Sequence, residues 1–175
     1  MNNVTIMADG FAMPDWSEKA RLFAKKVLAQ LKRGNWNFTI LFCDDKKITE
    51  LNSKYRNKNE PTDILSFKLD DPMPENKMFL SFHDVKKNKK TVYYPGDIVI
   101  SLDTLRGNSL YFNVGEDEEL RRLLIHGILH LDGMDHETMD KNEPMLALQE
   151  KILNKLRNVR IKSGIRDGGK SENPF

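Results

Sequence analysis

The sequence predicts an α/β (α+β-like) fold in which one small sheet of about four strands packs with about five helices. Apolar runs of period two, typical of strands, lie early in the chain, and apolar residues spaced three or four apart, typical of helices, dominate its second half. With 175 residues, of which 39% are hydrophobic, the chain can bury one sizeable core. We therefore expect a single domain over residues 1–160 and a flexible tail over residues 161–175.

Four short segments are predicted strands. Residues 4–7 are a short run with β-branched side chains near the start of the sequence. In residues 37–42, Phe38, Ile40 and Phe42 alternate with the residues between them, and this period of two suits a buried strand. Residues 64–69 and 97–102 are apolar or alternating runs, and each follows a turn signal that contains a proline, Pro61 or Pro95. Residues 70–95 hold three prolines and a basic run, so we expect a solvated excursion between these two strands.

Four longer segments have helical spacing. The first covers residues 16–33, with Asp15 as its N-cap, Glu18 as the capping-box partner and Gly34 as the C-terminal stop. The others lie near residues 48–55, 120–131 and 145–156, where apolar side chains recur on one helical face. Each of these faces predicts packing against the sheet or a neighbouring helix.

Composition excludes several classes of protein. Cys43 is the only cysteine, so no internal disulfide can form, and residues 1–10 lack the basic and apolar regions of a signal peptide. No stretch approaches the roughly 18 apolar residues of a membrane-spanning helix. The formal net charge of +2 is too close to neutral to indicate a polyanionic partner by itself. We expect a cytoplasmic protein without a membrane role.

Three of the four histidines, His126, His130 and His136, lie within eleven residues. Residues four apart on a helix have Cβ atoms about 6 Å apart, so the first two can direct their imidazoles at one ion. Gly133 can adopt the left-handed conformation that ends a helix, and this would return His136 to the same point. The pattern predicts a metal site at the end of a central helix rather than three unrelated histidines.

Three imidazoles leave a fourth coordination position open, and zinc lowers the pKa of a water bound there to about 7. The spacing therefore predicts one zinc ion and hydrolytic chemistry. His83, within the excursion of residues 70–95, is expected to be a surface histidine. Asp135 either orients a ligand imidazole or caps the helix that follows, and we favour the cap.

These residues resemble a known family. The run from His126 to His136 matches the pattern H-G-x-L-H-L-x-G-x-D-H of the YbeY-type endoribonucleases. Residues 55–67, which include Arg56, are similar to the family's second signature, and residues 96–101 are similar to its third. The resemblance covers residues 35–155 in the family's order. This chain departs from the family at Met134, where an aromatic residue is usual, and at Lys68, where proline is common.

The resemblance implies an α/β fold with a small mixed sheet and a three-histidine site for zinc or another divalent transition metal such as nickel. It also implies cleavage of single-stranded RNA during 16S ribosomal RNA maturation and ribosome quality control. The implied partners are ribosomal RNA and the ribosome or its associated proteins. Arg56 stands where the family has an arginine, and its planar guanidinium suits bidentate binding of phosphate, so we expect it to be catalytic. The alternative for Arg56 is a salt bridge at a helix end.

Two other functions stay open from the sequence. Zinc peptidases also carry an H-x-x-x-H helix, but there a glutamate follows the first histidine as general base, whereas this chain has Gly127. Glu119 and Glu137 leave room for a carboxylate from elsewhere in the chain. The second alternative is a non-catalytic, ribosome-associated module whose metal only holds the fold.

Overall fold

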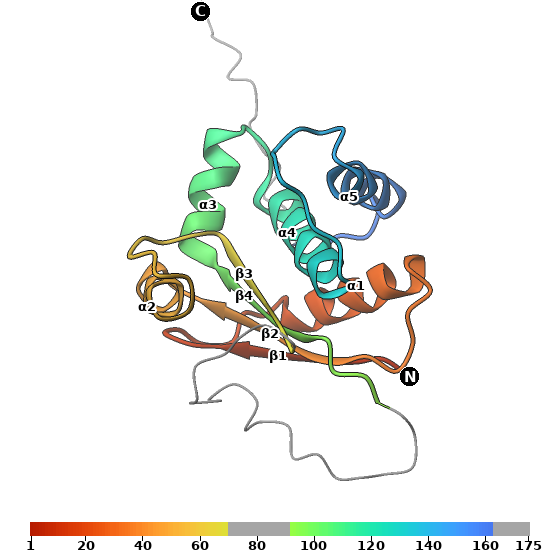
Figure 1. Cartoon of the computed structure of the whole chain (residues 1–175), viewed down its shortest axis with the longest axis horizontal. Helices are drawn as coiled ribbons and strands as arrows, with labels where there is room; N and C mark the ends of the chain where they lie inside the picture. Colours follow the sequence, from red (N-terminus) through yellow and green to blue (C-terminus); the bar gives the residue numbers. More distant parts are fainter. Residues whose placement is uncertain (70–91, 163–175) are drawn as a thin grey trace, which may run out of the picture.

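The computed structural model describes residues 1–69 and 92–162. Within these residues, four strands form one sheet and five helices pack around it (Figure 1). The strands are β1 (Asn3–Ala8), β2 (Asn37–Cys43), β3 (Ile64–Lys68) and β4 (Gly96–Ser101). The helices are α1 (Ser17–Gln30), α2 (Asp45–Arg56), α3 (Leu102–Tyr111), α4 (Glu116–Leu131) and α5 (Pro144–Lys155).

The sheet has the strand order β1-β2-β4-β3 and is mixed. Strand β2 pairs in parallel with both β1 and β4, whereas β3 pairs antiparallel with β4 and forms one edge. The backbone carbonyl of Asp63 accepts a hydrogen bond from the backbone N–H of Ser101 at 3.0 Å, which extends this antiparallel pairing by one residue. The predicted α/β fold with a small mixed sheet is confirmed.

Both faces of the sheet are covered. Because successive side chains of a strand point to opposite faces, Phe38 and Ile40 of β2 enter the larger core with α1, α4 and α5, while Leu41 and Cys43 enter a smaller core. Side chains of β2, β3, β4 and α2 form this smaller core (Leu41, Cys43, Ile48, Leu51, Leu65, Phe67 and Val99). Helices α2 and α4 therefore approach the sheet from opposite faces.

The first helix differs from its predicted ends. The residue at the N-cap of α1 is Trp16, no side chain caps the helix, and Glu18 pairs with Arg21 instead of completing a capping box. The predicted cap at Asp15 is therefore wrong. At the other end the left-handed residue is Lys32, with φ of 55°, so the chain turns before Gly34.

Helix α3 has no counterpart among the segments predicted from spacing. Ser101 caps it by accepting a hydrogen bond from the backbone N–H of Thr104 at 3.3 Å, so β4 passes directly into α3. Leu110, Tyr111 and Phe112 near its end are exposed. Since α3 buries only a narrow apolar face, its residues show little of the periodicity that marks the other helices.

The described residues extend two positions beyond the predicted domain boundary at residue 160. Ile161 is fully buried, and the backbone N–H groups of Ile161 and Lys162 donate to the Asp117 carboxylate at 2.7 and 2.8 Å. Residues 163–175, the rest of the predicted tail, lie outside the described residues. None of the helices in the described part of the chain has both the length and the apolar character needed to cross a membrane.

Candidate metal centre

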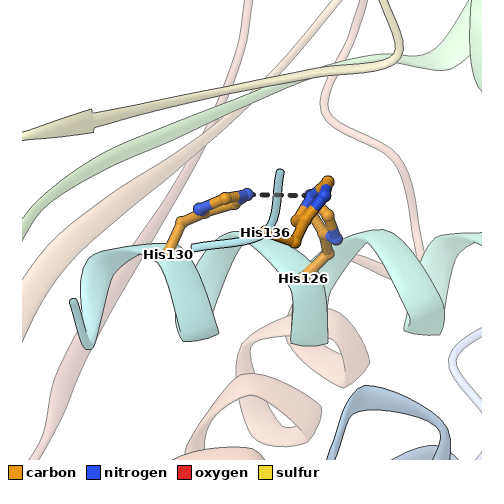
Figure 2. A group of neighbouring side chains, drawn as sticks. All are labelled: His126, His130 and His136. Atoms are coloured by element: carbon orange, nitrogen blue, oxygen red, sulfur yellow. Dashed lines mark hydrogen bonds between the residues drawn. The ribbon is translucent and has the colours of Figure 1, made fainter. Parts of the chain in front are cut away.

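The three clustered histidines meet at one point. His126 and His130 lie one turn apart on α4, and His136 returns to them from the segment after the helix (Figure 2). Gly133 has φ of 89°, the left-handed conformation predicted for it, and it reverses the chain after α4. One ring nitrogen of each histidine lies within 4.8 Å of the other two, and the Nε2 atoms of His126 and His130 are 3.0 Å apart.

Helix α4 carries this cluster close to the sheet because of Gly127. A Cβ atom built at this position would lie 2.8 Å from Cδ1 of Ile98 in β4 and 3.0 Å from Cδ1 of Ile64 in β3. Contacts this short are shorter than ordinary van der Waals separations. The glycine of the motif therefore allows α4 to pack against strands β3 and β4, which brings His126 and His130 to the edge of the sheet.

Each histidine presents its Nδ1 atom to an oxygen. The Nδ1 of His126 is 2.8 Å from Oε1 of Gln149, that of His130 is 3.1 Å from the carbonyl of Met134, and that of His136 is 2.9 Å from the carbonyl of Thr138. Carbonyl oxygens only accept hydrogen bonds, so each Nδ1 carries the proton and each Nε2 keeps its lone pair.

This arrangement fits a divalent transition metal such as zinc. Two Nε2 lone pairs only 3.0 Å apart repel each other unless a cation or proton lies between them. Neutral imidazoles with a fixed Nδ1–H are the usual nitrogen ligands of zinc. The three-histidine cluster can therefore hold a metal ion.

Burial keeps the two helical histidines neutral. Burial lowers the pKa of His126 despite the opposing hydrogen bond to Gln149. Burial and the neighbouring His126 lower the pKa of His130 to about 4. A ligand that is already deprotonated near neutral pH binds a metal without first releasing a proton.

A cleft of about 500 Å³ opens beside the cluster. It is lined by residues of strand β3, of the end of α2 and of the loop after it, together with His126, His130 and Asp135. Three cationic side chains line it, Arg56, Lys58 and Lys68. The cleft is therefore open and polar and joins basic groups to the histidines.

Arg56 is the last residue of α2 and reaches the outer edge of β3. Its Nη2 atom donates to the backbone carbonyl of Ser66 at 3.1 Å. The helix ends there because Asn57 adopts a left-handed conformation with φ of 57°, one that asparagine tolerates better than most residues. The buried Asn52, one turn earlier, donates to the carbonyl of Glu60 at 2.9 Å and fixes the loop that follows. The structure thus brings Arg56 into the same cleft as two of the histidines.

The remaining predictions near the site have different outcomes. The predicted cap at Asp135 is wrong, because α5 begins at Pro144 and Asp135 accepts a hydrogen bond from the backbone N–H of His136. Its carboxylate lies 3.7 Å from Nδ1 of His130. His83 lies outside the described residues. Met134 is partly buried against the larger core and orients His130 through its backbone carbonyl.

Gln149 is the contact that sequence reasoning missed. It lies on α5 four residues after Met145 and three before Ile152, within the apolar stripe, and only 6% of it is exposed. A lone amide on an otherwise apolar helix face was the available signal, since buried polar side chains need partners. The sequence could not show that this partner is His126.

Comparison with known proteins shows which family the chain resembles. The family profile described as Endoribonuclease YbeY matches residues 8–157, which include all three clustered histidines and Arg56. Endoribonuclease YbeY of Treponema denticola is 43% identical over 139 residues, 79% of this chain and 83% of that protein. Endoribonuclease YbeY of Borreliella burgdorferi, strain B31, is 42% identical over 138 residues, 78% of this chain and 84% of that protein.

Among solved structures, the solution structure of TM1509 from Thermotoga maritima is similar, with a TM-score of 0.53 and 25% sequence identity. The alignment covers 95% of this chain and 99% of that one, and the two proteins share the same overall fold. The family profile runs from the end of β1 to just beyond α5. This chain belongs to the YbeY endoribonuclease family.

Proposed function

We propose that this protein is a zinc-dependent endoribonuclease that cleaves single-stranded RNA in the cytoplasm. The observation that carries the proposal is the cleft in which His126 and His130 share one surface with the cations of Arg56, Lys58 and Lys68. A histidine cluster alone supports metal binding, whereas the neighbouring basic groups favour a polyanionic substrate. Family membership supports RNA as that polyanion.

The chemistry required is phosphodiester cleavage, which develops negative charge on the phosphoryl oxygens. A bound zinc ion supplies positive charge and acidifies water at the site. Arg56 would bind two phosphoryl oxygens through its planar guanidinium, and Lys58 and Lys68 would hold neighbouring phosphates of the same strand. We further propose that the RNA belongs to a 16S ribosomal RNA precursor or to a defective ribosome. The protein would bind this RNA together with ribosome-associated proteins.

Peptide hydrolysis receives less support from the site. The position of the peptidase glutamate is Gly127, and a Cβ atom there would already lie 2.8 Å from Cδ1 of Ile98 and 3.0 Å from Cδ1 of Ile64, which leaves no room for a longer side chain. The more distant Glu119 is buried and paired with Arg122 at 3.2 Å. The site thus lacks the carboxylate arrangement that defines the zinc peptidase motif.

The test is cleavage of a labelled single-stranded RNA by metal-free protein to which one equivalent of zinc is added. We expect zinc to restore cleavage to wild type but not to His126→Ala, with a duplex of the same sequence cut far more slowly. Cleavage of a peptide library without RNA cleavage would replace this proposal with the peptidase. Protein that binds zinc and cuts neither substrate would favour the non-catalytic, ribosome-associated module.

A further inference from the structure

The three histidines are oriented in two different ways. His130 and His136 are held by backbone carbonyls, those of Met134 and Thr138, which no substitution removes. His126 is held by a side chain, the amide of Gln149, at 2.8 Å. Gln149 belongs to α5, whereas His126 belongs to α4, so this contact joins the metal centre to a second helix.

The orientation of the Gln149 amide follows from its other neighbour. Its Nε2 atom lies 3.2 Å from Oε1 of Glu150, and the same carboxylate oxygen accepts a hydrogen bond from Nε of Arg122 at 2.9 Å. Burial raises the pKa of Glu150, but the hydrogen bonds from Arg122 and Gln149 outweigh burial and hold this pKa below its ordinary value. Glu150 is therefore ionised near neutral pH and can only accept.

This carboxylate determines which end of the amide faces His126. If the amide were reversed, Oε1 of Gln149 would face the Glu150 carboxylate, and two acceptors would repel each other. The Nε2 of Gln149 must therefore point to Glu150, and its Oε1 must point to Nδ1 of His126. Arg122, Glu150 and Gln149 thus form a chain of hydrogen bonds that ends on the ligand imidazole.

We propose that Gln149 is a positioning residue of the metal centre, which accepts the Nδ1–H of His126 and so presents its Nε2 lone pair to the metal. The inference rests on the proposed zinc site, but it does not depend on RNA cleavage. Partners of this kind fix both the tautomer and the ring orientation of a ligand histidine. Removing one lowers metal affinity by about tenfold to a hundredfold.

Three variants test the proposal. Gln149→Met keeps a side chain of similar length on the apolar face of α5 but removes the acceptor. The double variant Gln149→Glu with Glu150→Gln exchanges the two groups, so residue 149 still accepts from His126 and residue 150 can donate to residue 149. Gln30→Met is the matched control, because Gln30 is half-buried at the end of α1 and is the only other glutamine of the chain.

The first measurement is zinc affinity, by competition with a chelator. We expect the zinc dissociation constant of Gln149→Met to rise by about tenfold to a hundredfold, and those of the exchanged variant and Gln30→Met to stay near that of wild type. Wild-type affinity in folded Gln149→Met would overturn the proposal. So would an exchanged variant that binds as weakly as Gln149→Met. Wild-type protein that takes up no zinc would instead overturn the proposed function.

The second measurement is the tautomer of His126, read from the nitrogen-15 NMR spectrum of metal-free protein. The background is His130→Ala, which removes the nitrogen next to Nε2 of His126. With Gln149 present we expect the proton on Nδ1, and with Met at position 149 we expect a mixture of tautomers. A proton on Nε2 with Gln149 present refutes the proposal even if Gln149→Met does not fold.

Discussion

Replacing Arg56 by alanine removes a guanidinium that lines the same cleft as His126 and His130. In zinc-loaded protein we expect the rate of single-stranded RNA cleavage to fall by about a hundredfold to a thousandfold, the usual cost of losing one charged donor to a transition state. The fold should tolerate the change, because the hydrogen bond from Arg56 to the Ser66 carbonyl is exposed and such bonds contribute about 1 kcal/mol. Zinc content should not change, since the oxygens that orient the three histidines belong to Gln149, Met134 and Thr138 and not to Arg56.

Arg56→Lys tests whether the positive charge alone suffices or whether the bidentate hydrogen bonding of the guanidinium is also needed. Lysine keeps one positive charge but loses the bidentate fork, so we expect it to recover only part of the lost rate. Arg106→Ala is the control, because Arg106 is an exposed arginine of α3 that pairs with Glu116 and does not line the cleft. Single-turnover cleavage and zinc content should be measured on each protein. If Arg56→Ala cuts RNA at the wild-type rate with full zinc, then Arg56 only links α2 to β3, and its catalytic assignment is wrong.

Three further predictions follow from the same site. Gly127→Ala should lower the free energy of unfolding by about 1–3 kcal/mol, because the added Cβ would press on Ile98. The control is Gly107→Ala, where the space is open, and its denaturation should show unchanged or slightly higher stability. Metal-free protein should lose stability as the pH falls from 6.5 to about 4, because in this range His130 takes up a proton in the unfolded protein but not in the folded one. Denaturation measured at several pH values should show a smaller loss of stability in His130→Ala. Lys68→Met should reduce the slope of log affinity for single-stranded RNA against log salt concentration by about 0.7 if Lys68 contacts one phosphate, and an unchanged slope would exclude that contact.

Much of the fold could be predicted because the strands and most helices bury apolar residues at regular intervals. The exceptions have physical causes. Helix α3 buries too few residues to show a clear period, and its start is set by Ser101, a residue equally compatible with the end of β4. The end of α1 was misplaced because Lys32, not a glycine, adopts the left-handed conformation, and the sequence gives no sign of this.

The histidine cluster was the easier part of the candidate site to predict. His126, His130 and Gly133 follow a local spacing rule, so their geometry depends on one helix and one turn. The contact between His126 and Gln149 spans 23 residues and depends on how α5 packs on α4, which no local pattern encodes.

The two faces of the sheet carry different halves of the site. Arg56 ends α2, which packs on the smaller core, whereas His126 and His130 lie on α4, which packs on the larger one. We therefore expect a substitution of Leu51 or Phe67 to displace the Arg56 guanidinium more than the imidazoles of His126 and His130. Evolution can then adjust turnover or substrate preference in one core without disturbing metal retention in the other, so natural variation in the smaller core should change the rate of cleavage more than zinc affinity.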